Sequence, residues 1–248
     1  MLDFSEMMAH HLLDHRLIAV GGGLSFTKLM LMMNIAAVLT AAVVVSAGRS
    51  RGKLRTAMES LLLFIREDIL EPAMGHDVHN FEPYFHTLFF FIFFMNLLGL
   101  VPWGATATGN ISVTAGLSLL TLLLINLSGM KRHGVLHHFK NLVPHGVPWP
   151  VVPLVFGIEL MGYFTKCIAL TIRLFANMTA GHIVLLVFLG LILMFGQSNP
   201  WAGLFIAPFS VLLAFLICLL EILVAGIQAY VFTMLTAIFV GGALHPEH

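Results

Sequence analysis

One arginine, Arg173, lies deep within an apolar stretch of this sequence. The guanidinium group of arginine stays protonated in proteins, so this residue cannot become neutral. Placing a permanent charge at the centre of a bilayer costs about 2.5–3.5 kcal/mol on insertion scales. A chain keeps such a residue for an ion path, as a fixed counter-charge or as the partner of a carboxylate. Its chemistry therefore indicates machinery that moves ions.

Other polar side chains share the apolar run of Arg173 at helical spacing. Glu159, Lys166 and Arg173 are spaced seven residues apart. On an α-helix, each step of seven residues turns the side chain by only about 20°. Asn177 follows Arg173 by one turn and lies near the same face. One stripe thus carries an acid, two bases and an amide along roughly 27 Å of helix.

A second set of polar side chains is predicted to lie where this helix meets the next one. His182 comes nine residues after Arg173, about half a helical turn around the axis, so we expect it to point toward a neighbouring helix. Glu221 and Gln228 lie in the next apolar run, seven residues apart, and share a face. If the two runs form a helical hairpin, the two sets of polar groups can meet.

Most of these side chains also have a purely structural interpretation. A snorkelling cation, interhelical hydrogen-bond partners or a paired core histidine would account for four of them: Lys166, Asn177, Gln228 and His182. Arg173 and Glu221 have no helix end nearby to reach. A structural salt bridge between these two is the alternative, although a buried pair is weak evidence for a stabilising role.

The composition is that of a polytopic membrane protein. Of 248 residues, 59% are hydrophobic and 10% are charged, whereas soluble domains are about 25% charged. The net charge is zero, which indicates no nucleic-acid partner. Cys167 and Cys218 lie in apolar runs and are predicted to be free, buried thiols. No metal or cofactor motif is present, so we expect neither. The first 23 residues do not have the pattern of a signal peptide.

The hydropathy pattern predicts an all-α integral membrane protein with a single domain, 1–248. Basic clusters after the first and third spans, at 49–55 and 131–140, place those ends inside the membrane-bound compartment by the positive-inside rule. The N-terminus is then outside, and residues 48–82 are inside. The predicted elements are an outer lead-in at 1–25, a span at 26–47, an inner amphipathic surface helix at 53–72, a hairpin of spans at 83–101 and 109–129, an inner loop at 130–153, and two long helices at 154–196 and 200–244.

The last two runs are unusually long for membrane spans. A helix of 43 residues is about 64 Å long, whereas the hydrocarbon core is about 30 Å thick. Each run is therefore two spans joined by a turn, or one steeply tilted helix. Neither run has a strong turn signal at its middle, which favours two long, tilted helices in a hairpin.

The motif around Arg173 resembles that of a known family. Arg-Leu-Phe-Ala-Asn-Met at 173–178, followed by Ala-Gly-His at 180–182, is similar to the signature of subunit a of F-type ATP synthases. The likeness continues in Glu159, Lys166 and the run 221–228, and it covers nearly the whole chain. It implies that the last two helices lie nearly horizontally in the membrane, against a rotor ring of c subunits.

The resemblance also implies roles for the polar residues. Arg173 would face the ring carboxylate, with Asn177 and Gln228 beside it. Many bacterial members carry Glu at the position of His182 and His at that of Glu221, so here the two types are exchanged and the pair is kept. This pair would line a path to the outside. Glu159 would line a path to the inside.

The implied function is ion translocation, with the proton as the expected ion, through two half-channels that couple ion flow to rotation and ATP synthesis. The chain itself would make no covalent bond. Its implied partners are the c ring, the b subunits of the peripheral stalk, the lipid bilayer and, indirectly, the F1 sector. We expect a bacterial plasma membrane, with the mitochondrial inner membrane as the alternative.

Two other classes of protein fit parts of this pattern. A secondary transporter would be expected to have an inverted repeat and broken helices, and no repeat is visible. A di-iron membrane enzyme is suggested by the spacing of His133, His137 and His138, with His76 and His79 on the same predicted side. That class needs further histidine boxes, so histidines in interfacial loops are the better interpretation.

Overall fold

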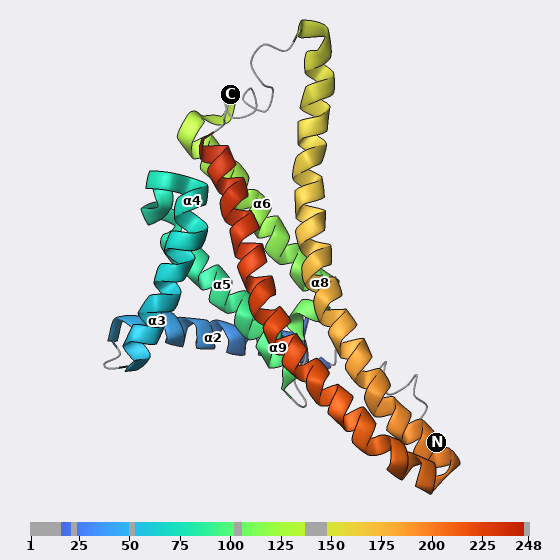
Figure 1. Ribbon diagram of the computed structural model, residues 1–248. Coiled ribbons are helices and arrows are strands. Elements are labelled where there is room, and N and C mark those ends of the chain that lie inside the picture. The colour runs from blue at the N-terminus through green and yellow to red at the C-terminus, as the bar shows by residue number, and fades with distance from the viewer. Residues whose placement is uncertain (1–15, 21–23, 50–52, 102–105, 137–147, 246–248) are drawn as a thin grey trace. The chain divides into compact units, whose positions relative to one another are not determined.

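The computed structural model describes residues 16–20, 24–49, 53–101, 106–136 and 148–245, and these are almost entirely helical. Their arrangement is drawn in Figure 1. Within these residues, five helical segments are long and apolar enough to cross a membrane: Lys28–Val45, Met58–Leu100, Ile111–His133, Trp149–Gln197 and Trp201–Leu244. The chain is therefore a predominantly helical integral membrane protein.

A short β-hairpin precedes the first long helix, where the sequence analysis expects only a polar lead-in. Strand β1 (Arg16–Val20) pairs antiparallel with β2 (Leu24–Thr27), and Val20 lies opposite Leu24. Two apolar runs separated by three glycines are a hairpin signal, because glycine adopts the turn conformations that hairpins need. The rest of the predicted lead-in, residues 1–15 and 21–23, lies outside the described residues.

Helix α2 (Lys28–Arg49) follows, and the predicted surface helix at 53–72 is then not a single α-helix. Helix α3 (Lys53–Phe64) continues into a π-helix, η1 (Ile65–Leu70), and a short helix α4 (Glu71–Met74). Gly75 is the first residue of the connection η2 (Gly75–Asp77), and its φ is 57°. A positive φ suits glycine because it has no Cβ.

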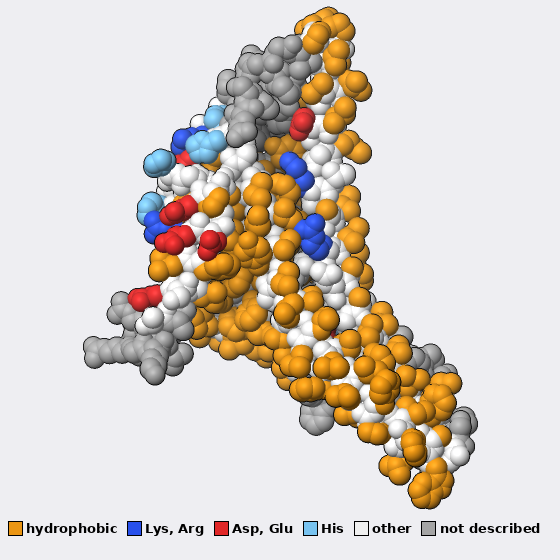
Figure 2. Space-filling model, viewed as in Figure 1, with side chains coloured by type: hydrophobic (Ala, Val, Ile, Leu, Met, Phe, Trp, Pro, Cys, Tyr) orange, Lys and Arg blue, Asp and Glu red, His pale blue; other side chains and the backbone are white. Residues whose placement is uncertain are grey.

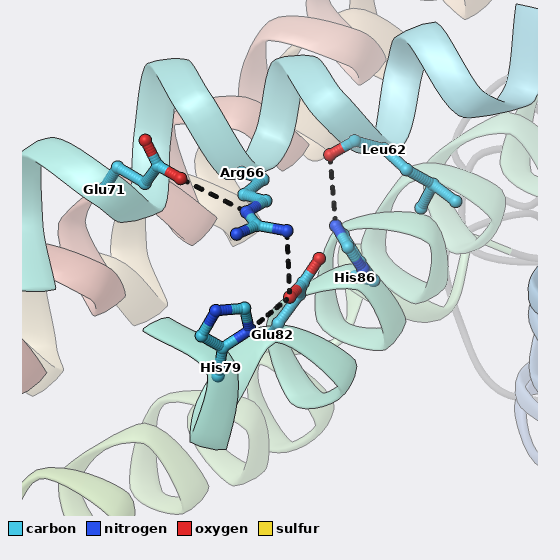
Figure 3. Close-up of polar contacts among 6 residues, drawn as sticks. All are labelled: Leu62, Arg66, Glu71, His79, Glu82 and His86. Atoms are coloured by element: carbon cyan, nitrogen blue, oxygen red, sulfur yellow. Dashed lines mark hydrogen bonds and ion pairs between the residues drawn. The ribbon is translucent and has the colours of Figure 1, made fainter. Parts of the chain in front are cut away.

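A cluster of charged side chains ties this bent segment to helix α5 (Val78–Leu100). Arg66 Nε donates to Glu71 Oε1 at 3.2 Å, and Arg66 NH1 lies 3.9 Å from Glu82 Oε2. His79 Nδ1 is also 3.9 Å from Glu82 Oε2 (Figure 3). We refer to Arg66, Glu71, His79 and Glu82 as the Arg66 cluster. Its members come from η1, α4 and α5, so it links the π-helix to the following span.

The two spans of the predicted hairpin correspond to α5 and α6 (Ile111–His133), with the one-turn helix η3 (Ala107–Gly109) between them in the sequence. Helix α5 begins five residues before the predicted span and contains Pro83 in its second turn. The predicted turn at 102–104 lies outside the described residues. After η4 (Trp149–Val151) come the two longest helices, α8 and α9.

Each of the two long apolar runs forms one continuous helix. Helix α8 (Val152–Ser198) has 47 residues and α9 (Pro200–Leu244) has 45. Figure 1 draws each of them as an unbroken helix. A 47-residue helix is about 70 Å long. The alternative of two spans and a turn within each run is therefore not what the chain adopts.

The chain divides into two compact units. Unit 1 contains Met1–Leu39, Phe91–Asn110 and Leu174–Gln228, and unit 2 contains Thr40–Phe90, Ile111–Arg173 and Ala229–His248. Hydrophobic side chains cover most of the visible surface of the long helices, and charged ones gather over the α3–α4 region (Figure 2). The core of each unit is apolar, with fully buried Met95, Leu174 and Met178 in unit 1 and Phe85, Phe232 and Val240 in unit 2.

Candidate functional site: a buried histidine–glutamate pair and an exposed arginine

The second half of α8 and the first half of α9 bring His182 and Glu221 together within unit 1. His182 Nδ1 and Glu221 Oε1 are 2.7 Å apart, although the residues are 39 positions apart in the sequence. The Glu221 side chain is only 2% exposed and that of His182 is 27% exposed. A buried carboxylate is costly unless it is paired and hydrogen-bonded. The histidine therefore satisfies one of its two oxygens.

Glycines allow the two helices to approach at this pair. A Cβ on Gly181 would lie 2.8 Å from Glu221 Oε1, which is too close for a side chain. Nearer the connection between the helices, a Cβ on Gly203 would lie 2.6 Å from the Cα of Gly196. Small residues at such contacts let helix backbones pack closely in membranes. The Ala-Gly-His sequence thus places the glycine where the carboxylate needs room.

The amides of Asn177 and Gln228 form a second link between the same helices. Asn177 Nδ2 donates to Gln228 Oε1 at 2.7 Å. Gln228 is 2% exposed, whereas Asn177 is exposed. The expectation that polar groups of the two runs meet across a hairpin is therefore confirmed for both pairs within unit 1.

Buried polar atoms of unit 1 also lack hydrogen-bond partners. Among the described residues, four such atoms in this unit are Asn96 Nδ2, Thr179 Oγ1, Glu221 Oε2 and Gln228 Nε2. Native proteins leave few buried polar groups unpaired, and ordered water is the usual partner where protein groups are absent. These atoms are therefore suited to hold water inside an apolar region.

Asn96 was not identified from the sequence. It is fully buried, and its Oδ1 accepts a hydrogen bond from Thr108 Oγ1 at 2.8 Å. Its position in a phenylalanine-rich span was an available signal, because an amide within a membrane helix needs a polar partner.

The remaining predicted site residues lie on the first half of α8, in unit 2. Lys166 Nζ lies 5.2 Å from the centre of the Tyr163 ring and 4.9 Å from that of Phe239. Contacts of this kind stabilise a cation by about 0.5–2 kcal/mol. Lys166 is half-buried, and these two rings lie against its charged end. Glu159 is exposed.

Arg173 is exposed on α8. Ala169 and Ala176, about one helical turn before and after it on the same face, are also exposed. Within the described part of unit 2, no ion pair involves Arg173. The pair that Glu221 forms is with His182, so the structural Arg173–Glu221 salt bridge considered from the sequence is not needed to satisfy that carboxylate. An uncovered arginine on an apolar helix requires an anionic or hydrated partner.

Among the described residues, no group of three or more His, Cys, Asp or Glu side chains is placed to hold a metal ion. His137 and His138 of the considered histidine box lie outside those residues. Cys167 and Cys218 are free thiols, as predicted, but they are half-buried rather than buried.

The fold and these contacts define a class: multi-pass α-helical membrane proteins with ionisable side chains inside their apolar helices. A family model described as ATP synthase A chain matches residues 28–241. A protein named ATP synthase subunit a from Chloroherpeton thalassium is 44% identical over 244 residues, covering 93% of this chain and 71% of the relative. This chain therefore belongs to the ATP synthase A chain family.

Two further relatives of the same name support this assignment. The protein from Myxococcus xanthus is 42% identical over 238 residues, and the match covers 91% of this chain and 76% of the relative. The protein from Parvibaculum lavamentivorans is 41% identical over 235 residues, and the match covers 92% of this chain and 88% of the relative. The resemblance inferred from the Arg173 motif is thus confirmed.

Proposed function

We propose that this chain translocates protons through two half-channels at the interface between the stator and the rotor ring of an F-type ATP synthase. Proton flow through it would drive rotation of the ring and ATP synthesis. Membership of the ATP synthase A chain family supports a proton-translocating role in general. The observation that carries the more detailed proposal is the His182–Glu221 pair, buried between two apolar helices.

The outer half-channel is assigned to the polar groups of unit 1. Histidine exchanges protons near neutral pH and a carboxylate can accept a proton from it and pass it on, so the two together suit a relay. Glu221 has one oxygen bonded to His182 and a second without a protein partner. The unpartnered atoms of Asn96 and Gln228 extend this polar lining. Water held by these atoms would supply the proton path.

Arg173 is proposed to act on the carboxylates of the ring. A carboxylate that faces lipid must be neutral, because the anion is too costly there. Beside a permanent positive charge the anion is favoured. Arg173 would thus release a proton from each passing ring site and would separate the two half-channels. Its exposure, without an ion pair in its own unit, supports a partner outside the chain.

The inner half-channel is assigned to the first half of α8. Glu159 is exposed and lies on the same helix as Arg173, two steps of seven residues away. Lys166 lies between them, with its charge held by Tyr163 and Phe239. An acid and a fixed cation along one helix face suit an aqueous exit.

The lengths of α8 and α9 support a steep tilt in the membrane, because both exceed what an upright span needs. The partners proposed are the ring of c subunits, the b subunits of the peripheral stalk and the bilayer, with the F1 sector acting indirectly. The relatives named above are bacterial proteins, which supports a bacterial plasma membrane.

The deciding experiment is Arg173→Ala in vesicles that carry the whole ATP synthase. We expect ATP synthesis driven by an imposed proton gradient to fall below a tenth of the wild-type rate, and passive proton leakage through the membrane sector to rise. Arg173→Lys should also fail, because the ammonium can lose its proton when desolvated and lacks the planar fork of arginine.

Arg66→Ala is the matched control, since Arg66 lies in the exposed Arg66 cluster. It should keep more than half of the wild-type rate. Near-normal synthesis with alanine at 173 would overturn the proposed function.

A further inference from the structure

The side of the His182 ring that faces away from Glu221 is also occupied. Thr106 Oγ1 lies 2.6 Å from His182 Nε2, and the Gly99 carbonyl oxygen lies 3.1 Å from the same nitrogen. Gly99 lies in the last turn of α5 and Thr106 directly precedes η3, and both are in unit 1 with the histidine. His182 therefore has polar partners at both ring nitrogens.

The two partners at Nε2 differ in what they can do. A carbonyl oxygen only accepts a hydrogen bond, whereas a hydroxyl group can donate or accept. When the ring is neutral and Nδ1–H donates to Glu221, Nε2 is an acceptor, and only the hydroxyl of Thr106 can donate to it. When the ring is protonated, Nε2–H can donate to the Gly99 carbonyl or to the hydroxyl. Thr106 thus fits both protonation states of the ring.

The packing shows that this contact depends on a glycine. A Cβ on Gly99 would lie 2.5 Å from Thr106 Oγ1, 2.8 Å from its Cγ2 and 3.0 Å from its Cβ. All three atoms are too close, so a rotation of the threonine side chain alone cannot relieve the clash. Glycine at position 99 leaves the space that the threonine fills.

We propose that Thr106 is a positioning residue for the proton relay, holding the His182 ring with Nδ1 toward Glu221 in both its neutral and its protonated state. This inference rests on the proposed function, since it assumes that His182 relays protons. The hydroxyl group of Thr106 is the part that matters, and the methyl group is not. Gly99 contributes its carbonyl group and the room for the threonine.

The test compares Thr106→Val with Thr106→Ser in the intact ATP synthase. Valine keeps the shape of threonine and removes the hydroxyl; serine keeps the hydroxyl and removes the methyl. We expect gradient-driven ATP synthesis to fall at least fivefold with valine and to stay above half of wild type with serine. The amount of this chain in the purified complex should be unchanged in both.

Additional variants guard against a failure of folding or assembly. Thr106→Ala removes the hydroxyl without adding bulk and should behave as valine does. Gly99→Ala keeps the hydroxyl but displaces it, and should also lower synthesis. Thr87→Val is the matched control, because Thr87 is exposed on α5 and its hydroxyl donates to Pro83 within the same helix. It should leave synthesis unchanged.

The outcomes separate this inference from the proposed function. If Thr106→Val and Thr106→Ala are as active as wild type while His182→Ala is inactive, the positioning role is wrong and the relay stands. Equal loss with serine and valine, in fully assembled complexes, would also overturn the role, because the hydroxyl would then not be what matters. If His182→Ala and Glu221→Ala are themselves fully active, the relay itself fails.

Discussion

The His182–Glu221 pair and the Arg66 cluster are two groups of ionisable side chains with opposite environments. Glu221 is 2% exposed and 2.7 Å from its partner. In the Arg66 cluster the distances are 3.2–3.9 Å and the side chains are 25–73% exposed. Exposed ion pairs contribute about 0–1 kcal/mol each, whereas removing one member of a buried pair costs about 3–5 kcal/mol.

The difference indicates what each group is for. The Arg66 cluster lies where water can solvate it, and it links the π-helix to α5 at low cost. The His182–Glu221 pair lies between apolar helices and leaves Glu221 Oε2 without a protein partner. A pair that served stability alone would be replaced at little cost by apolar residues. The burial of this pair and the unpartnered oxygen fit the proposed role in moving protons.

The largest expected difference between the two groups is seen on removing a carboxylate from each. Glu221→Ala should lower gradient-driven ATP synthesis at least tenfold, because it removes a relay carboxylate and leaves His182 Nδ1 unpaired. Glu82→Ala, in the Arg66 cluster, should keep more than half of the wild-type rate. Synthesis in vesicles, normalised to the amount of assembled complex, measures both. If Glu221→Ala and Glu82→Ala lowered ATP synthesis equally, the two groups of ionisable side chains would not differ in function.

An exchange of the two relay residues sharpens the comparison. His182→Glu combined with Glu221→His restores one acid and one base to the same site, whereas each change alone places like residues together. We expect the double variant to synthesise ATP several-fold faster than the worse single variant. A double variant no better than that single one would show that the side chains do not act as a pair.

A smaller loss is expected at the amide link. Gln228→Leu removes the acceptor of Asn177 Nδ2 and apolarises part of the proposed lining, so synthesis should fall about threefold to tenfold, or about 0.7–1.4 kcal/mol in barrier height. Gln197→Leu, at an exposed position near the end of α8, is the control and should have no effect. If Gln228→Leu synthesised ATP at the wild-type rate, Gln228 would not be part of the proposed half-channel, and only the His182–Glu221 pair would remain in it.

The smallest effect is predicted for Arg66→Met. This change removes ion pairs to Glu71 and Glu82 that are partly exposed, so the loss of stability should be about 0.2–1 kcal/mol for each pair. The thermal unfolding midpoint of the purified complex should fall by only a few degrees, and less at high salt because exposed charges are screened. A large, salt-independent fall would mean that the cluster is effectively buried.

The sequence predicted the parts of the site that depend on helical spacing. The steps of seven residues from Glu159 to Arg173, and from Glu221 to Gln228, follow from the period of the helix alone. The prediction that His182 faces the partner helix was also correct, because its angular offset from Arg173 points it away from that stripe. The contact with Glu221 bears this out.

Contacts made by irregular backbone could not be predicted in this way. Thr106 reaches His182 across 76 residues of sequence, from a stretch that has no helical period. The break in the predicted helix at 53–72 was missed for a related reason, since Ile65–Leu70 contains neither proline nor glycine to mark it. The π-helix depends on tertiary packing that a periodicity analysis does not see.

That π-helix also has an evolutionary meaning. A π turn closes i→i+5 hydrogen bonds and so contains one residue more than an α turn. Ile65 at its start and Leu70 at its end are both fully buried, so the helix on either side keeps its inward face. A lineage in which this segment gained or lost one residue would change only this turn. Relatives that differ by a single-residue insertion or deletion here should keep the flanking helices in register, with an ordinary α turn in its place.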